Sequence, residues 1–312
     1  MIGSEEFYPW RKIYFCLIAI IQAMILVSLS QKTPITWDEA YAIKNSIQFS
    51  VWHILSGHTG EANVAPLYFL LLKFLSWAGL NVRLVAIVPT AMFIALVAHR
   101  WLRMGLFWSL TVVVLLNTTI AVTEYGWLAR PYALWCFLTW VFLDSAINEK
   151  PKLAVFGAGL LAATTPFAII QVPLLFILML NYINPLTNGF LCAIYLYSFI
   201  LCLKTPSYPF WWPGLAGFIP LVLHHARYWI LIPTALLMYR LGAYFNFLIY
   251  MLLCISAVVF IFYIHQPGMN GVVKIVNDGF YITERYMIWL LPTTLAYLTR
   301  LWSEYEDKDI AL

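Results

Sequence analysis

Apolar runs alternate with polar stretches along the chain. The first run, Ile13 to Leu29, follows Arg11 and Lys12 and is long enough to form a membrane-spanning helix. The next stretch, Ser30 to Ala65, is the longest polar segment, and within it Trp37 to Leu55 places apolar residues at helical spacing. We therefore expect an uncleaved first span, followed by an amphipathic helix lying in the outer membrane interface.

The run from Pro66 to Gly79 is apolar but short. At about 1.5 Å per residue it reaches about 21 Å, which is less than the roughly 30 Å of a hydrocarbon core. We expect this segment to pack on the outer face or to be partly re-entrant. The second span is then Arg83 to Ala98, and it places His99, Arg100 and Arg103 in the cytoplasm. This orientation agrees with the rule that basic residues at the end of a span stay on the cytoplasmic side.

The remaining apolar runs predict further spans, joined on the outer side by polar segments at 124–131 and 265–284. They are Leu106 to Thr123, Tyr132 to Ile147, two short spans within Leu153 to Tyr182, Phe190 to Leu203, the ambiguous Gly214 to Arg240, Tyr244 to Ile264 and Arg285 to Leu301. The expected fold is an all-α integral membrane protein with about ten transmembrane helices. We expect residues 1–312 to form a single polytopic domain, with a first outer loop of juxtamembrane helices at 30–79 and a cytoplasmic tail at 303–312.

Composition supports a membrane protein and argues against a nucleic-acid-binding one. Hydrophobic residues make up 63% of the chain and charged residues 10%, whereas soluble domains carry about 25% charged residues. Aromatic residues make up 17% of the chain, and such residues are enriched in membrane proteins where they lie at the two membrane–water interfaces. The chain has no basic tract or RNA-binding motif, so we expect no nucleic acid partner. The cysteines lie in apolar runs without metal-ligand spacing, which is typical of buried thiols.

The charged residues that map to the outer side are the candidates for chemistry. Ionisable groups close to membrane depth are costly and are functional candidates for that reason, although some are ordinary loop charges. The acidic ones are Asp38, Glu39, Glu61, Glu124, Asp278 and Glu284, and the basic ones include Arg130 and Arg285.

Several segments resemble one family of membrane enzymes. They are Thr36 to Tyr41 (TWDEAY), Ala65 to Lys73 (APLYFLLLK), Gly79 to Leu84 (GLNVRL), Ala129 to Leu134 (ARPYAL) and Glu284-Arg285-Tyr286 followed by Pro292. In this order they resemble the outer-loop and juxtamembrane motifs of GT-C glycosyltransferases, the polytopic enzymes related to protein O-mannosyltransferases and aminoarabinose transferases. Val64-Ala65 stands where the family has His-Pro, and this chain shows no soluble C-terminal domain of the kind that many relatives carry.

The resemblance implies a sugar donor linked to polyprenyl phosphate, an acceptor hydroxyl on a glycan, lipid or protein, and inversion at the anomeric carbon. Asp38 is the implied general base, because a carboxylate can take the proton of the attacking hydroxyl. The implied substrate-binding residues are Arg130, Arg285 and Lys73 for the phosphate, Glu39 and Glu124 for sugar hydroxyls or for orienting the arginines, and Tyr68 and Tyr132 for the sugar pocket or for core packing. We expect no cofactor, with a divalent metal left open, and a bacterial or archaeal plasma membrane with both termini cytoplasmic.

Two other functions fit the same pattern. A transporter or lipid flippase also places charged groups along a pathway, although such proteins often show paired halves, and this chain shows no such pairing. A non-catalytic GT-C-like membrane subunit is the second alternative, while the presence of Asp38 and Arg130 favours an enzyme.

Overall fold

A computed structural model describes residues 9–56, 66–148 and 150–164, together with Pro292, Leu295, Ala296 and Thr299. The helices are α1 (Pro9–Gln31), α2 (Trp37–Gln48), α3 (Val51–Leu55), α4 (Pro66–Trp77), α5 (Leu84–Trp101), the 3-10 helix η1 (Leu102–Met104), α6 (Leu106–Asn117), α7 (Ile120–Thr123), α8 (Tyr132–Ile147) and α9 (Pro151–Ala162). The described part of the chain contains no strand, which confirms the all-α prediction for these residues. The expected spans and loops between 165 and 291, and the tail, lie outside the described residues.

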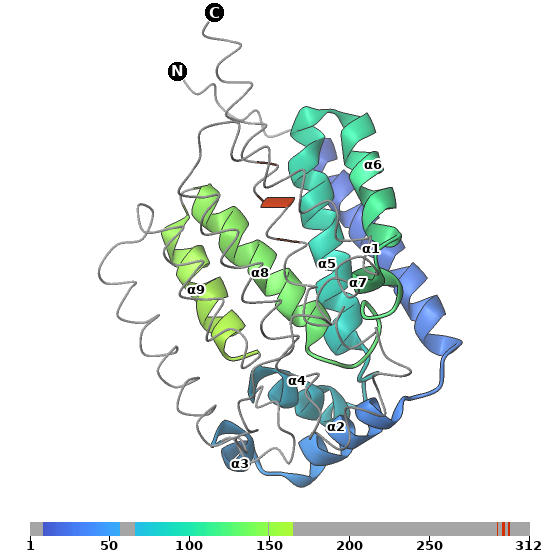
Figure 1. Ribbon diagram of the computed structural model, residues 1–312, viewed down its shortest axis with the longest axis vertical. Coiled ribbons are helices and arrows are strands. Elements are labelled where there is room, and N and C mark those ends of the chain that lie inside the picture. The colour runs from blue at the N-terminus through green and yellow to red at the C-terminus, as the bar shows by residue number, and fades with distance from the viewer. Residues whose placement is uncertain are drawn as a thin grey trace, which may run out of the picture.

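Helices α1, α5, α6, α8 and α9 form a bundle, and α2, α3 and α4 gather at one of its ends (Figure 1). Within the bundle, α5 packs against α1, α6 and α8, and α8 packs against α9. Most side chains of α5 and α8 are buried, and Phe93 meets Trp140 edge to face with ring centroids 6.0 Å apart. Helices α2, α3 and α4 lie at the end of the bundle where α5 and α8 begin, so that end brings the first polar segment close to residues 124–131.

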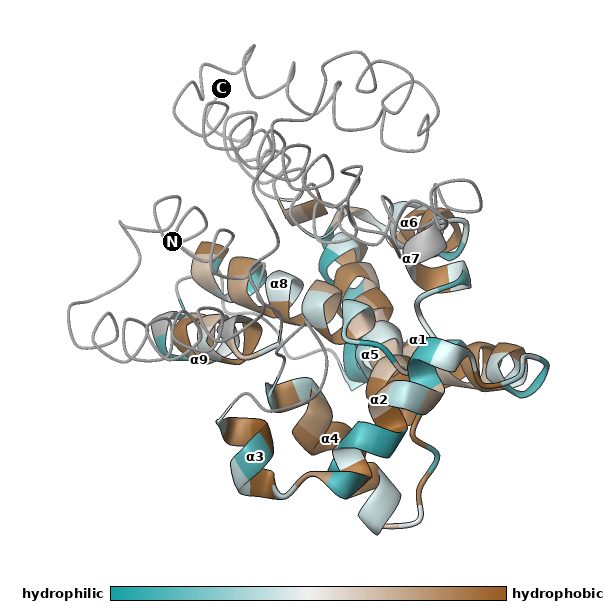
Figure 2. Cartoon of the chain, turned by 60° about the horizontal axis from the view of Figure 1, so that its bottom comes forward, coloured by the Kyte–Doolittle hydropathy of each residue, from teal (hydrophilic) through white to brown (hydrophobic). Residues whose placement is uncertain are grey.

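Two helical stretches in the described residues are long and apolar enough to cross a membrane: Pro9–Gln31 and Leu84–Met104. The face of α1 that packs inward carries Ile18 and Leu26, whereas Ile13, Ile20 and Met24 are exposed. In Figure 2 apolar residues cover much of the long helices, while hydrophilic residues are prominent in α2 and α3. Because the exposed side chains of α1 are mostly apolar, this helix lacks the polar face that a helix at the surface of a water-soluble protein presents to water.

Helix α4 is too short to span a bilayer. Its 12 residues extend about 18 Å at 1.5 Å per residue. It contacts α2 and α3, and a small core forms around Tyr68, Phe69 and Leu72 with Ala42 and Ile54. The segment packs across the end of the bundle, as its length predicts, and the side of the membrane on which it lies stays a prediction.

The prediction of one helix over Trp37 to Leu55 is wrong, because the chain breaks between α2 and α3. Phe49 adopts an extended conformation after α2. Ser50 then caps a new helix, since its side chain accepts a hydrogen bond from the backbone N–H of His53 at 3.2 Å. The Ser50 side chain thus offers the backbone a local hydrogen bond in place of the one that would continue α2.

The span predicted over Leu106 to Thr123 is not one continuous helix, and whether it crosses a membrane stays a prediction. Helix α6 ends at Asn117, and the chain resumes as the short α7. The side chains of Asn117, Thr118 and Thr119 each donate a hydrogen bond to a carbonyl three or four residues earlier. Three such back-bonding residues in a row compete with the regular helix pattern and favour its end.

Hydrogen bonds tie the helices together away from α2–α4. Ser109 on α6 donates to the carbonyl of Ala98 on α5 at 2.6 Å, and its hydroxyl also lies 2.8 Å from the hydroxyl of Tyr14 on α1. At the end of α5, the indole of Trp101 donates to the hydroxyl of Thr299 at 3.0 Å. The sequence places both Trp101 and Thr299 at the cytoplasmic ends of predicted spans. This hydrogen bond therefore joins two ends that are expected on the same side of the membrane.

Candidate functional site

The first outer segment begins with a capping box. The Thr36 hydroxyl accepts the backbone N–H of Glu39 at 3.3 Å, and the Glu39 carboxylate accepts the backbone N–H of Thr36 at 2.9 Å. The Thr-x-x-Glu spacing is the known sequence pattern for this motif, and it starts α2. The motif places the side chains of Asp38 and Glu39 in the first helical turn, where the helix dipole favours negative charge.

Arg83 binds the Glu39 carboxylate with two parallel hydrogen bonds. Its Nε donates to Oε1 and its Nη2 to Oε2, both at 2.9 Å, and the two residues are 5% and 0% exposed. Arg83 stands at the start of α5, where its own backbone N–H donates to the Asn81 side chain at 2.9 Å. This planar two-point contact is the strongest geometry available to an arginine–carboxylate pair.

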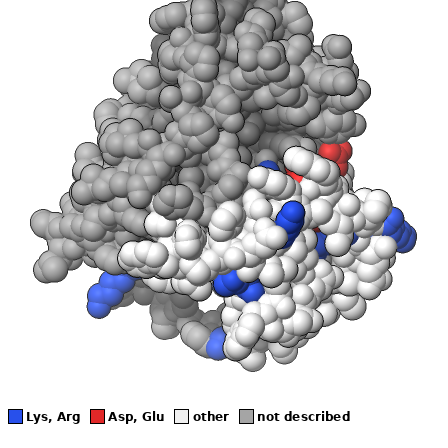
Figure 3. Space-filling model, turned by 90° about the horizontal axis from the view of Figure 1, so that it is seen from below, with Lys and Arg blue, Asp and Glu red and all other residues white. Residues whose placement is uncertain are grey.

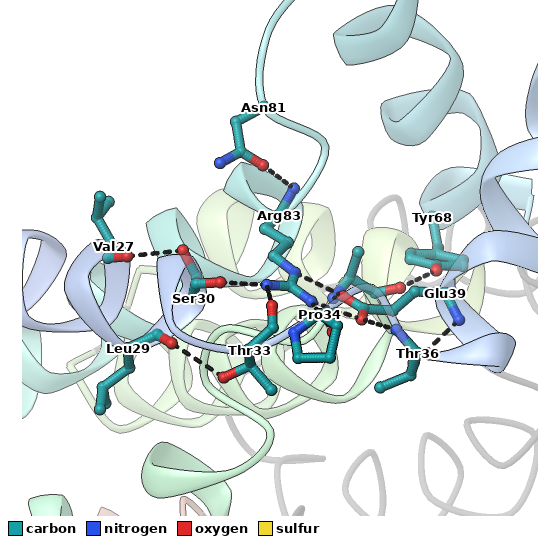
Figure 4. A network of polar contacts seen from close by, with 11 residues as sticks. Val27, Leu29, Ser30, Thr33, Pro34, Thr36, Glu39, Tyr68, Asn81 and Arg83 are labelled. Carbon is teal, nitrogen blue, oxygen red and sulfur yellow. Dashed lines mark hydrogen bonds and ion pairs between the residues drawn. The ribbon is translucent and has the colours of Figure 1, made fainter.

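The other donors of Arg83 bind the chain between α1 and α2 (Figure 4). Nη1 donates to the carbonyls of Ser30 and Thr33, the latter at 2.8 Å, and Nη2 donates to the carbonyl of Pro34 at 2.9 Å. All five guanidinium N–H groups are therefore used. The guanidinium carbon also lies 5.0 Å from the centre of the Trp127 ring, within cation–π range.

Ala129 is the point where the 124–131 segment joins this network. Its backbone N–H donates to Oε1 of Glu39 at 2.9 Å, across 90 residues of sequence. Its carbonyl accepts a hydrogen bond from the hydroxyl of Tyr68, which is buried on α4. Two side chains from separate helices thus hold both backbone polar groups of one residue.

Asp38 and Arg130 lie side by side next to this junction. Nη1 of Arg130 lies 3.4 Å from the backbone carbonyl of Asp38, 92 residues earlier, in a long hydrogen bond. Both residues are half-buried. The predicted general base and the predicted phosphate-binding arginine therefore occupy the same part of the molecule.

Lys73 lies on α4 and points toward the C-terminal end of α2. Its ammonium donates to the carbonyls of Ser46, Ile47 and Phe49 at 3.2, 3.1 and 2.9 Å. A lysine in this position satisfies carbonyls that have no partner within the helix and complements the negative end of the helix dipole. All three of these hydrogen bonds hold α2 against α4.

The other predicted site residues have different surroundings. Glu124 is half-buried at the start of the 124–131 segment. Tyr132 is buried at the start of α8 and packs edge to face on Tyr125, with centroids 5.3 Å apart. Arg285 lies outside the described residues. In the same described part of the chain, no three His, Cys, Asp or Glu side chains gather as metal ligands.

The pKa of Glu39 lies below its ordinary value. Burial raises this pKa, but the hydrogen bond from Arg83, the backbone hydrogen bonds from Thr36 and Ala129, and the positive charge of Arg83 together lower it further. The carboxylate is thus ionised at neutral pH despite its complete burial. Its four hydrogen bonds favour the charged form over the protonated one.

Seen from the end formed by α2–α4, the described surface is mostly uncharged (Figure 3). Acidic atoms appear at one edge of this face, and lysine and arginine atoms are scattered over it. Trp37, Trp52 and Trp77 are strongly exposed on these helices. An uncharged surface rich in exposed tryptophan is typical of a membrane–water interface.

Sequence reasoning missed Arg83 as a residue of this site and used it only to mark the start of a span. Two signals were available in the chain. An arginine at the edge of a long apolar run favours a carboxylate partner. The Thr36-x-x-Glu39 spacing predicts a capping box, which explains Glu39 without any substrate.

No protein-family model, curated protein or solved structure matches this chain.

Proposed function

We propose that this chain is a polytopic membrane glycosyltransferase that moves a sugar from a polyprenyl-phosphate donor to an acceptor hydroxyl at the outer face of a membrane. The observation that carries the proposal is the meeting of two segments, 36–41 and 124–134, that both resemble GT-C motifs. Arg130 reaches the carbonyl of Asp38, and Ala129 binds Glu39. The proximity of the Arg130 guanidinium to the backbone of Asp38, at one end of an apolar bundle, supports this chemistry.

The proposed setting is a multi-pass protein with about ten spans and cytoplasmic termini. Its support is the apolar exposed face of α1, the second long apolar helix at Leu84–Met104 and the low content of charged residues. Helices α2–α4 then lie in the outer interface, with their exposed tryptophans at headgroup level. A bacterial or archaeal plasma membrane supplies the polyprenyl carriers.

The proposed reaction is a single displacement. The acceptor oxygen attacks the anomeric carbon, the bond from that carbon to the phosphate oxygen breaks, and the electron pair leaves with the polyprenyl phosphate. Asp38 takes the proton of the attacking hydroxyl. Arg130 pairs with the phosphate as its negative charge increases, and a guanidinium suits two phosphate oxygens at once. Attack from the face opposite the phosphate inverts the anomeric centre.

The roles of the remaining residues follow from their contacts. Both carboxylate oxygens of Glu39 already accept hydrogen bonds, so its proposed role is to orient neighbouring groups rather than to bind sugar. Tyr68 and Lys73 hold α4 against the 124–131 segment and α2. Glu124 and Tyr132 stay proposed sugar contacts, and Arg285 a proposed phosphate contact.

The test is a transfer assay with purified protein in nanodiscs. Polyprenyl-phosphate sugars of several kinds are incubated with glycan, lipid and peptide acceptors, and product is followed by mass spectrometry. We expect turnover with at least one pair, and a loss of about 100-fold to 10,000-fold with Asp38→Asn, the range that general-base catalysis supplies.

The matched control is Asp144→Asn, because Asp144 pairs with Arg100 at the opposite end of the bundle, at 3.5 Å. This control should transfer sugar at the wild-type rate. Full transfer by Asp38→Asn would refute the assignment of the base. Movement of a solute across liposomes without sugar transfer would replace the proposal with a transporter.

A further inference from the structure

We infer that Glu39 and Arg83 form a positioning pair that sets Arg130 beside Asp38 by holding the backbone at Ala129. The consequence for catalysis rests on the proposed function, whereas the mechanical role does not. Neither Glu39 nor Arg83 needs to touch a substrate for this role, so both are positioning residues.

The contacts between the two segments are reciprocal. The side chain of Glu39 holds the backbone of Ala129, and the side chain of Arg130 reaches the backbone of Asp38. Residues 38 and 39 are consecutive, as are 129 and 130. In the first segment Asp38 has the proposed chemical role and its neighbour Glu39 holds the opposite backbone. In the second segment Arg130 has a proposed chemical role and also makes the contact with the opposite backbone.

The backbone around Ala129 is fixed on both sides. Its N–H belongs to the peptide group that precedes it and binds Glu39, and its carbonyl belongs to the following peptide group and binds Tyr68. Fixing two successive peptide groups restricts both backbone dihedrals of the residue between them. The position from which the Arg130 side chain departs is set in this way.

Glu39 can fix Ala129 only if its own carboxylate does not move, and Arg83 provides that restraint. Two of the guanidinium donors hold the carboxylate, and the other three bind carbonyls at residues 30, 33 and 34. A guanidinium with all donors engaged cannot rotate without breaking several hydrogen bonds in a buried site. Oε1 of Glu39 therefore presents a fixed acceptor to the Ala129 N–H.

Hydrogen–deuterium exchange of the full chain in nanodiscs tests the mechanical role directly. Glu39→Gln removes the paired carboxylate while keeping the side-chain size. We expect the Ala129 amide to exchange about tenfold faster, because it loses a charge-assisted hydrogen bond. Peptides from the middle of α8 should keep their protection. The control Asp144→Asn should leave residues 124–131 unchanged.

Two exchange results would overturn the inference. Unchanged exchange over residues 124–131 would show that Glu39 does not hold this segment. Faster exchange throughout α5 and α8 as well would show that the pair stabilises the whole bundle without positioning any one part. These results do not depend on sugar transfer, so they decide the mechanical role even if no donor is turned over and the proposed function fails.

A double-mutant cycle tests the link to catalysis. Sugar transfer is compared for Glu39→Gln, Arg130→Lys and the double variant at matched folded protein. If Glu39 acts through Arg130, the double variant loses little more activity than Arg130→Lys alone, and Arg83→Lys behaves like Glu39→Gln. Losses that multiply would show that Glu39 acts independently of Arg130 and would overturn this part of the inference.

Discussion

The carboxylate of Glu39 and the guanidinium of Arg83 meet through two hydrogen bonds of 2.9 Å, both residues being almost completely buried and 44 positions apart. A buried pair of this kind adds little net stability compared with an apolar pair of equal volume, yet the loss of one partner leaves an uncompensated charge. The main effect of the Glu39–Arg83 pair is on geometry, because it fixes where the polar segment after α1 contacts the start of α5.

Removing one member of the pair should destabilise the protein more than replacing both. We expect Arg83→Met to cost about 3–5 kcal/mol, because the Glu39 charge stays buried without its partner. The double variant Glu39→Gln with Arg83→Met should recover part of this loss. Thermal unfolding followed by tryptophan fluorescence in nanodiscs measures both. Equal losses in the single and double variants would contradict the pairing.

The stability supplied by Glu39 should depend on pH in a defined direction. Its pKa in the folded protein lies below the ordinary value of about 4.5, so the folded state favours the ionised form. The contribution is fully present above pH 4.5 and is lost as the pH falls through the lower folded value. The difference in unfolding temperature between wild type and Glu39→Gln should stay constant from pH 7 to about 4.5 and narrow below it. A difference that grows on acidification would refute the sign of the shift.

Lys73 should stabilise the end of α2. Lys73→Met leaves three carbonyls without the ammonium, and we expect a loss of about 1.5–3 kcal/mol, the range for hydrogen bonds to charged groups. Exchange should rise at residues 45–49. The matched control is Lys44→Met, because Lys44 is an exposed lysine on α2 itself, and it should change stability by less than about 0.5 kcal/mol.

Arg130→Lys should separate charge from geometry at the proposed phosphate contact. Lysine keeps the positive charge but lacks the planar pair of donors. We expect kcat to fall about 100-fold, comparable to removing one donor that stabilises transition-state charge, with a smaller change in the KM for the donor. A rise in KM alone would indicate that Arg130 binds the donor equally in the ground and transition states.

The exposed face of α1 should lie in lipid. Ile20 stands near the middle of Pro9–Gln31 and is 58% exposed. Ile20→Arg should oppose insertion by about 2.5–3.5 kcal/mol, as for arginine at the centre of a span. A glycosylation-mapping assay reports the inserted fraction. Gln31→Arg, at the exposed end of the same helix, should insert normally, and equal insertion of both variants would argue against a spanning α1.

Local sequence patterns predicted part of the fold well. The predicted range Tyr132 to Ile147 is the range of α8 in the structure. A short helix begins at Pro66 in the prediction and in the structure. The apolar run after Arg11 and Lys12 predicted α1, although the helix extends further at both ends. Apolar periodicity and proline placement act within a few residues, so the sequence displays them directly.

The breaks in two predicted helices came from polar side chains that bind nearby backbone groups. Ser50 caps a new helix, and residues 117–119 bond back to the preceding turn. Their hydroxyls and amide are visible in the sequence, but apolar periodicity continues across them and favoured an unbroken helix. Local hydrogen bonding outweighed that periodicity.

The site was only partly predictable for a different reason. The motif residues Asp38 and Arg130 were identified, while Arg83 was not, because its partners lie 44 to 53 positions earlier. The contact between Glu39 and Ala129 spans 90 positions and uses a backbone N–H that no residue type reveals. Such contacts depend on how helices far apart in sequence pack together.

The five engaged donors of Arg83 imply an order in which these contacts can form during synthesis. The carbonyls at residues 30, 33 and 34 and the carboxylate of Glu39 leave the ribosome before Arg83, so the turn after α1 lacks its contacts with Arg83 until the start of α5 has been made. A nascent chain halted short of residue 83 should leave this turn open to protease. Extension through α5 should close it, so we expect protease resistance of this turn to appear only once Arg83 has been made.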